Sequence, residues 1–286
     1  MLLGIDVGGT FIKHGVVLPD GTIIEQHQTP TQAAEGRDAL VARIIQIAQE
    51  LSDRYPGLAI GIGVPGVVDP HTKHVQSPPN LPGWDRVPLQ AIVSEVLGVP
   101  VVVENDANAG AVAELRAGAG KMLRDFLYVT LGTGVGGGIV INNQLYTGPH
   151  GDAGEIGHIY LGTDDSAVVL EQVIGRMGIL HRYGGGPEVD VADIDSRASG
   201  GEEHAIRVMI DTGRLLGMGL CSMLAVLGLR NVVVGGGISR SELILETARR
   251  TVQERAIPTI ARSAQIVPAH FLNDAGLVGA AMLSAL

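Results

Sequence analysis

Short apolar runs separated by glycine turns mark the beginning of the chain. Residues 2–8, 12–18 and 19–28 predict three strands, of which the last two are joined at an Asp-Gly turn. Apolar positions at helical spacing then predict a helix over 36–51, and residues 58–66 predict a buried strand that ends at a Pro-Gly turn. The chain therefore begins as a hairpin beside a leading strand, followed by a helix and another strand.

The opening pattern returns near the middle of the chain. Residues 125–148 predict strand, glycine turn, strand and hairpin, which makes them a weak internal repeat of residues 2–24. The other predicted elements are strands at 100–106 and 231–237 and helices at 88–97, 107–118, 203–228, 240–255 and 273–286. Mixed strands and helices with two related glycine turns predict an α/β fold with a cleft between two halves.

The length of 286 residues exceeds that of one typical domain, so we expect two domains. The predicted break falls at Gly118–Gly120. It separates a smaller N-terminal α/β domain, formed by residues 1–118 and about 273–286, from a larger C-terminal α/β domain at 119–272.

Composition and charge limit which kinds of ligand and which cellular location we expect. The net charge is −10 and no stripe of Lys or Arg is present, which argues against a nucleic-acid partner. A phosphorylated ligand would then need local backbone N–H groups, a lysine and a divalent cation. The single cysteine, Cys221, is expected to be a small buried hydrophobe. Because no signal segment and no uninterrupted membrane-length apolar run is visible, we expect a cytoplasmic protein without a membrane partner.

The first candidate for phosphate binding is the turn "DVGGTFIK", with Asp6, Gly8, Gly9, Thr10 and Lys13. Glycines let backbone N–H groups approach phosphate oxygens, the threonine can donate a hydroxyl, and the lysine supplies positive charge. The aspartate could hold a metal ion through water. The alternative is an ordinary hairpin turn, because the pattern is neither a Rossmann nor a Walker A loop.

Two later turns have the same character. Gly132, Thr133 and Gly134 follow an apolar strand in "LGTGVGGG", and Gly235–Gly237 end the strand in "VVVGGGISR". The second turn could grip phosphate like the first, and the third could lie against a nucleoside. In both turns glycine could equally serve local geometry alone.

Polar residues at the end of "VVVENDANAG" are the candidates for acid–base chemistry. Asp106 could be a general base that accepts a proton from a substrate hydroxyl, with Asn105 orienting that substrate. The alternative is a helix N-cap, for which both residue types are common. Asn80, in "PPNLPGW", either faces the cleft or closes a turn.

Carboxylates near a histidine suit a neutral sugar. Glu155 and His158 in "GEIGH", with Glu171 beyond them, could accept and donate hydrogen bonds to sugar hydroxyls. We expect His158 to be held by neighbouring hydrogen bonds with one ring nitrogen on the sugar. The apolar run at 167–175 would orient Glu171 by packing alone.

Seven motifs occur along the chain in this order: "GIDVGGTFIK", "GVPGVVDP", "SPPNLPGW", "VENDANAGAVAELRAGAGK", "TLGTGVGGGIV", "GEIGHI" and "VVVGGGI". Together they resemble the ROK family of repressors, open reading frames and sugar kinases. The resemblance covers most of the chain and implies the two-domain actin-like, sugar-kinase and Hsp70 fold. It implies that Asp106 is the catalytic base. Implied sugar contacts are Gly66, Asn105, Asp106, Gly134, Glu155, His158 and Glu171, and Asn80 is a further candidate from its place in the loop. Candidate nucleotide contacts are Asp6, with Mg²⁺ through water, and Gly8, Gly9, Thr10, Lys13, Gly132, Thr133, Gly134, Gly235, Gly236 and Gly237.

The chain departs from the family pattern after His158. Many family members carry a three-cysteine loop there that binds a structural zinc with the histidine, whereas this chain has no cysteine between His158 and Glu171. Asp164 and Asp165 are not usual partners for a structural zinc, so we predict no zinc site. Family repressors add a helix-turn-helix segment before the kinase-like part. The first predicted strand begins here at residue 2, which favours a kinase.

These observations lead to an expected activity and its alternatives. We expect an ATP- and Mg²⁺-dependent hexose kinase that phosphorylates the 6-hydroxyl, with glucose as the first candidate acceptor. Fructose, mannose or an N-acetylhexosamine as acceptor, and polyphosphate as donor, remain alternatives. A sugar-binding regulator without catalysis is the alternative of another class. The resemblance also implies a homodimer.

Overall fold

The computed structural model describes residues 1–78, 81–163, 166–186 and 188–285 and divides the chain into two units. The first unit comprises Met1–Met122, Gln144–Ala153 and Asp274–Leu286. The second comprises Leu123–Asn143 and Gly154–Asn273. The chain therefore returns to the first unit twice, once in the middle and once at its end.

The first unit is built on a five-stranded sheet in the order β3-β2-β1-β4-β7. Its strands are β1 (Leu2–Val7), β2 (Phe11–Val17), β3 (Ile23–Pro30), β4 (Ile60–Val64) and β7 (Val101–Asn105). The first three strands pair antiparallel, and β1, β4 and β7 pair parallel. The parallel β4 is buried at every residue, whereas the edge strand β3 is largely polar and exposed, as expected for their positions in the sheet.

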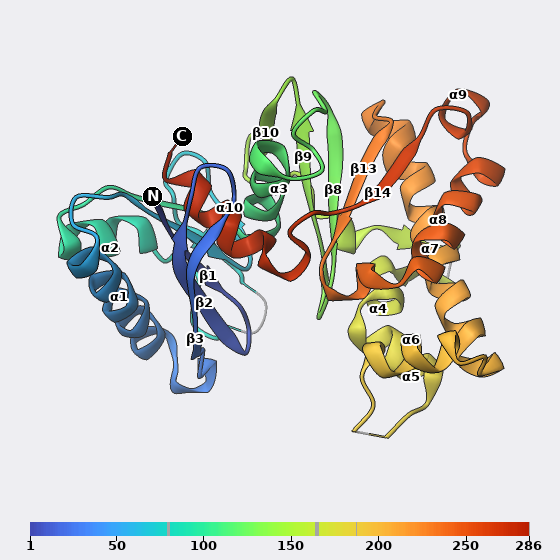
Figure 1. Cartoon of the computed structure of the whole chain (residues 1–286), viewed down its shortest axis with the longest axis horizontal. Helices are drawn as coiled ribbons and strands as arrows, with labels where there is room; N and C mark the ends of the chain where they lie inside the picture. The colour runs from blue at the N-terminus through green and yellow to red at the C-terminus, as the bar shows by residue number, and fades with distance from the viewer. Residues whose placement is uncertain (79–80, 164–165, 187, 286) are drawn as a thin grey trace. The chain divides into compact units, whose positions relative to one another are not determined.

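Helices cover both faces of this sheet. Helices α1 (Arg37–Arg54) and α2 (Leu89–Leu97) lie on one side, and α3 (Asp106–Ala117) and α10 (Ala275–Leu283) on the other (Figure 1). Close packing on α10 depends on glycine. A Cβ at Gly279 would lie 1.7 Å from the carbonyl oxygen of Ala109, and one at Gly61 would lie 1.6 Å from that of Ala280. The C-terminal helix is thereby locked between α3 and β4.

The second sheet repeats the topology of the first. Its order is β10-β9-β8-β13-β14, with β8 (Phe126–Leu131), β9 (Val135–Ile141), β10 (Gln144–Tyr146), β13 (Asn231–Gly235) and β14 (Gln265–Pro268). All of its strands except β10 lie in the second unit. Like β1, strand β8 pairs antiparallel with the strand after its glycine turn and parallel with a later strand. The predicted internal repeat is therefore confirmed.

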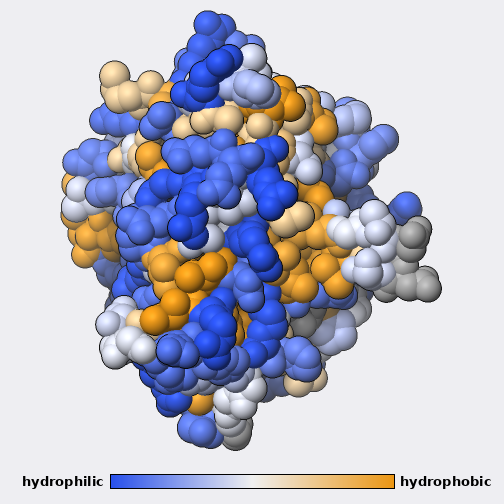
Figure 2. Space-filling model, turned by 90° about the vertical axis from the view of Figure 1, so that its right-hand side faces the viewer, coloured by the Kyte–Doolittle hydropathy of each residue, from blue (hydrophilic) through white to orange (hydrophobic). Residues whose placement is uncertain are grey.

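The second unit is rich in helices, and α7 and α8 run beside its sheet (Figure 1). These helices are α4 (Leu170–Ile174), α5 (Arg176–Tyr183), α6 (Val191–Ser199), α7 (Glu203–Leu227), α8 (Glu242–Arg255) and α9 (Pro258–Ala261). By length and composition alone α7 could cross a membrane, yet it packs against α4, α5, α6 and α8 as a core helix does. On the face shown in Figure 2, hydrophobic patches are interrupted by hydrophilic residues.

The predicted α/β fold is confirmed, and most predicted elements appear within a few residues of their expected bounds. Helix α1 runs to Arg54, three residues beyond its predicted end, and α3 begins at Asp106, one residue early. Several short elements were missed: β5 (Val67–Val68), β6 (Val75–Gln76), β11 (Tyr160–Leu161), β12 (Val168–Val169), β14, α4, α5, α6 and α9. Cys221 is only partly buried, so the expectation of a buried thiol was wrong.

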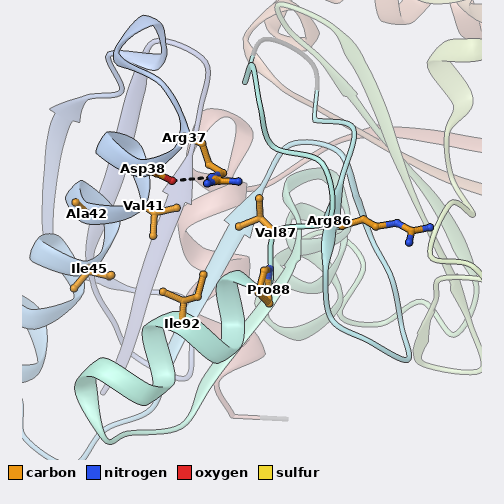
Figure 3. Close-up of a pocket in the computed structure, with 9 residues that line it drawn as sticks. All are labelled: Arg37, Asp38, Val41, Ala42, Ile45, Arg86, Val87, Pro88 and Ile92. Atoms are coloured by element: carbon orange, nitrogen blue, oxygen red, sulfur yellow. Dashed lines mark hydrogen bonds and ion pairs between the residues drawn. The ribbon is translucent and has the colours of Figure 1, made fainter.

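A hollow of about 430 Å³ lies between α1 and α2 in the first unit (Figure 3). Its wall is mostly aliphatic, from Val41, Ala42, Ile45, Val87, Pro88 and Ile92. Arg37 is paired with Asp38, and the guanidinium of Arg86 points away from the apolar side chains. No residue predicted for chemistry lines this hollow.

Candidate active site

Asp106 is the first residue of α3 and directly follows strand β7. The side chain of Asn105 caps this helix: its Oδ1 accepts hydrogen bonds from the N–H groups of Ala107, at 2.9 Å, and Asn108, at 3.0 Å. A cap of this kind satisfies backbone donors that have no partner inside the helix. The Asp106 carboxylate is thus presented at a helix N-terminus, where negative charge is favoured.

The rest of the Asn105 side chain is also engaged in the fold. Its Nδ2 donates to the carbonyl oxygen of Gly66 at 2.9 Å, which leaves one N–H of the amide for a substrate. Gly66 needs glycine because its φ is +86° and a Cβ would lie 2.6 Å from the Cα of Pro78. The alternative of a helix cap therefore holds for Asn105, and any contact with a sugar would be an addition to it. The predicted site residue Asn80 lies outside the described residues.

Asp6 and Lys13 are direct partners across β1 and β2. The Nζ of Lys13 lies 3.4 Å from Oδ1 of Asp274, which also accepts a hydrogen bond from Gln26 at 3.0 Å. The pKa of Asp6 is raised to about 6, chiefly by burial, with Lys13 opposing the rise and Asp274 adding to it. Asp274 was missed from the sequence. The only signal was an acidic residue at the start of the last helix, a position where capping side chains are common, although Asp274 makes no capping hydrogen bond.

Gly63 is a neighbour of both Asp6 and Asp106. It pairs with Asp6 on one side and with Glu104 on the other, at the carboxyl ends of three parallel strands. A Cβ at Gly63 would lie 3.7 Å from both Asp6 Oδ1 and Asp106 Cα. Ligands of open α/β sheets bind at this end of the strands. The predicted metal-side acid and the predicted base are therefore close neighbours.

The first glycine turn joins β1 to β2. The N–H of Gly8 donates to the carbonyl oxygen of Phe11 at 3.0 Å, and Thr31 closes the turn by donating its hydroxyl to the carbonyl oxygen of Gly8 at 2.6 Å. Apart from the chain neighbours of Gly9, no described residue has an atom within 4 Å of where a Cβ on Gly9 would stand, and both Gly9 and Thr10 are exposed. The turn thus presents open backbone, as an anion cradle requires.

The second glycine turn joins β8 to β9 and holds Glu171. The N–H of Val135 donates to Oε2 of Glu171 at 2.8 Å. A Cβ at Gly134 would lie 2.5 Å from the same oxygen. The expectation that packing alone orients Glu171 was therefore wrong, because a backbone donor of the turn fixes its carboxylate. Among the described residues beyond its chain neighbours, nothing lies within 4 Å of a Cβ placed on Gly132. Thr133 is exposed.

Glu155 and His158 precede α4, the helix that carries Glu171, and both are more exposed than Glu171. Their side chains are 45% and 75% exposed, with 3.8 Å between His158 Nε2 and Glu155 Oε2. The segment after His158 forms the short antiparallel pair β11–β12, and the N–H of Leu170 then donates to the carbonyl oxygen of Ile159 at 2.8 Å. The contact between the imidazole and Glu155 is longer than a hydrogen bond, and it is an ion pair only when the imidazole is protonated.

In the third turn, glycine is explained by packing. A Cβ at Gly235 would lie 2.5 Å from the hydroxyl of Tyr128, and one at Gly236 would lie 2.2 Å from the carbonyl oxygen of Leu131. Gly236 also has a φ of +81°. Gly237 is less crowded, with Asn273 Oδ1 at 3.2 Å from its Cβ position. The alternative of local geometry accounts for the first two glycines, and a role near a nucleoside stays a prediction.

The side chains that could serve as metal ligands bear on the expected Mg²⁺ site. Within the described residues there is no group of three or more His, Cys, Asp or Glu side chains that could hold an ion. Mg²⁺ does not need one, because it keeps several waters and binds through one or two carboxylates together with substrate phosphates. The enclosed Asp6 carboxyl beside an open glycine turn fits such a site. The absence of zinc stays a prediction.

Comparison with known proteins agrees with this reading of the fold. The α/β architecture with two mixed sheets is that of the actin-like ATPases, to which solved sugar kinases belong. The model of the ROK family matches residues 2–285, and the chain belongs to this family.

Three relatives carry further information. The chain is 30% identical to the glucokinase of Thermotoga maritima, covering 99% of this chain and 96% of that protein. It is 31% identical to the N-acetylmannosamine kinase of Citrobacter koseri, covering 99% and 98%. The crystal structure of a ROK family glucokinase from Streptomyces griseus in complex with glucose and AMPPNP has a TM-score of 0.86 and 32% identity, covering 99% and 98%.

Proposed function

We propose that this protein is an ATP-dependent hexose kinase that phosphorylates the 6-hydroxyl of its sugar, with glucose as the first candidate acceptor. The observation that carries the proposal is the position of Asp106, which stands at the start of α3 and next to Asp6 across Gly63. Full-length relatives named as sugar kinases support the reaction class.

Asp106 acts as the general base. A sugar hydroxyl is a weak nucleophile, and a carboxylate within hydrogen-bond reach accepts its proton as the oxygen attacks the terminal phosphoryl group. The N-cap by Asn105 holds this carboxylate at the helix terminus. The remaining Nδ2–H of Asn105 would donate to the sugar.

Sugar binding falls to residues of both units. Glu171 retains acceptor capacity for sugar hydroxyls, because Val135 occupies one lone pair of its carboxylate and each oxygen has two. Gly66, Gly134, Glu155 and His158 complete the proposed contacts. The exposed His158 would gain its restraint from the sugar itself.

The nucleotide would be held by the glycine turns. The backbone N–H of Gly9, the hydroxyls of Thr10 and Thr133 and the Lys13 ammonium would bind phosphate oxygens. Gly8 and Gly132, whose N–H groups donate to Phe11 and Gly134 within their turns, would shape the two phosphate grips. Asp6 would hold Mg²⁺ through water, and the ion when bound supplies positive charge that offsets the charge on the transferring phosphoryl group. Gly235–Gly237 would lie near the nucleoside.

One experiment separates this proposal from its rivals. ADP release would be measured with glucose, fructose, mannose, N-acetylglucosamine and N-acetylmannosamine, and phosphoryl transfer would be followed separately with polyphosphate as donor. We expect the highest kcat/KM with ATP and glucose, and NMR of the product would show the phosphate on the 6-oxygen. Turnover confined to an N-acetylhexosamine, or to polyphosphate, would replace the acceptor or donor. Sugar binding without turnover by any pair would identify a regulator.

Homodimer formation and a cytoplasmic location are also part of the proposal. Exposed apolar side chains on α7, such as Met218 and Val226, are compatible with a dimer through the second unit. Light scattering on the purified protein determines its oligomeric state.

A further inference from the structure

Glu104 is a largely enclosed acidic residue that the proposed mechanism leaves without a task. It is the residue before Asn105 in β7, and burial of its carboxyl raises its pKa. Its Oε1 accepts two hydrogen bonds, one from the N–H of Asn105 at 2.9 Å and one from Nδ2 of Asn108 at 3.0 Å. One carboxylate oxygen therefore connects the end of the strand with the first turn of the helix.

These two donors flank the proposed base. Asn105 immediately precedes Asp106, and Asn108 follows it by two residues. The Asn108 side chain is 1% exposed, and its Oδ1 has no hydrogen-bond partner among the described residues, so the bond to Glu104 anchors its amide. Asn105 in turn caps α3 and bonds Gly66. A single acceptor, Oε1 of Glu104, thus binds residues on both sides of Asp106.

We propose that Glu104 is a positioning residue that sets the geometry of Asp106 by binding the residues on both sides of it. This inference rests on the proposed function, in which Asp106 takes the proton of the sugar hydroxyl. Glu104 acts on Asp106 through its hydrogen bonds to Asn105 and Asn108. A misplacement of about 1 Å at a catalytic group can cost on the order of 10²-fold in rate.

The required property of Glu104 is an acceptor oxygen rather than a charge. A protonated carboxyl keeps a carbonyl oxygen that can accept both bonds, and so does a glutamine amide. Glu104→Gln should therefore keep the junction intact, whereas Glu104→Leu fills a similar volume and removes the acceptor. The two variants separate positioning from the mere presence of a side chain.

The test compares kcat, sugar KM and the pH profile of kcat for the full-length variants. We expect Glu104→Gln to keep kcat within threefold of wild type with an unchanged pH profile. Glu104→Leu should lose at least tenfold in kcat, while sugar KM changes by less than threefold. A kcat for Glu104→Leu near that of wild type, or an equal loss in Glu104→Gln, would overturn the proposal.

A matched control distinguishes positioning from lost stability. Glu114 is a fully buried glutamate on the same helix, and its Oε2 accepts a hydrogen bond from the N–H of Ala119 at 2.7 Å, at the far end of α3. Glu114→Leu should lower the melting temperature without lowering kcat of the folded enzyme. If Glu104→Leu fails to fold, Asn108→Ala, which removes the other end of the same bond, takes its place with the same expected loss in kcat.

Failure of this inference and failure of the proposed function give different results. If Asp106→Ala keeps its turnover, Asp106 is not the base and the proposed mechanism fails whatever the Glu104 variants do. If Asp106→Ala is inactive while Glu104→Leu is fully active, only the positioning role is refuted.

Discussion

At the scale of single residues, the contacts that fix the candidate site are mostly made to backbone. Asp106 and Glu171 were predicted as site residues from the sequence, because carboxylates after an apolar strand or near "EIGH" suit sugar chemistry. The donor that orients Glu171, the N–H of Val135, could not be identified in this way. Every residue except proline carries the same backbone donor, so only the three-dimensional path of the turn reveals which one is used.

Gly134→Ala tests whether the observed position of the Glu171 carboxylate matters for sugar binding. The added methyl would stand 2.5 Å from Oε2 of Glu171 and must displace the carboxylate from the N–H of Val135. A hydrogen bond to a charged group contributes about 1.5–3 kcal/mol, so we expect sugar KM to rise roughly 10- to 100-fold. Steady-state kinetics over a range of sugar concentrations measures this change.

Gly200→Ala is the matched control for that substitution. Its methyl would meet only ordinary contacts, the nearest being the carbonyl oxygen of Arg197 at 3.4 Å, and it lies at the end of α6 in the same unit. Its kinetics should equal those of wild type. An unchanged sugar KM in Gly134→Ala would mean that Glu171 does not bind the sugar from its observed position.

At the scale of elements, the long periodic segments were predictable and the short ones were not. The apolar runs and turns of residues 2–28 and the helical spacing of α1 and α7 each extend over enough positions to define their elements. Strands β11 and β12 have two residues each, and α4 has five. Such elements are defined by their tertiary neighbours, which is why the segment around Glu171 was not predicted.

Strand β2 carries a buried histidine that makes stability depend on pH. Burial of His14 lowers its pKa, and the charges of His27 and Arg54 lower it further, while Glu50 and Glu25 act in the opposite direction. The unfolded chain therefore takes up a proton near pH 6.5 that the folded protein resists, so stability is lost as the pH falls below that value.

His14→Gln should make this loss of stability less steep. The measurement is the free energy of urea unfolding of wild type and variant at several pH values between 5 and 8. His71→Gln, at an exposed position in a loop, should retain the wild-type dependence. Parallel curves for wild type and His14→Gln would show that another group dominates the response in this range.

At the scale of the whole molecule, the internal repeat predicted from the glycine turns corresponds to two sheets of identical strand order. The proposed functional residues are divided between the units that contain these sheets. Asp6, Lys13 and Asp106 belong to the first unit, whereas Gly134 and Glu171 belong to the second. The proposed reaction therefore draws on residues of both units, as the two related glycine turns in the sequence led us to expect.

The central claim is that Asp106 accepts the proton of the sugar hydroxyl, and its most direct test is the turnover of Asp106→Ala with ATP and glucose beside its affinity for glucose. General-base catalysis typically contributes 10²–10⁴-fold, so kcat should fall by roughly that factor. The dissociation constant for glucose, measured by calorimetry, should stay within a few-fold of wild type. A variant that binds glucose and turns over at nearly the wild-type rate would contradict the account.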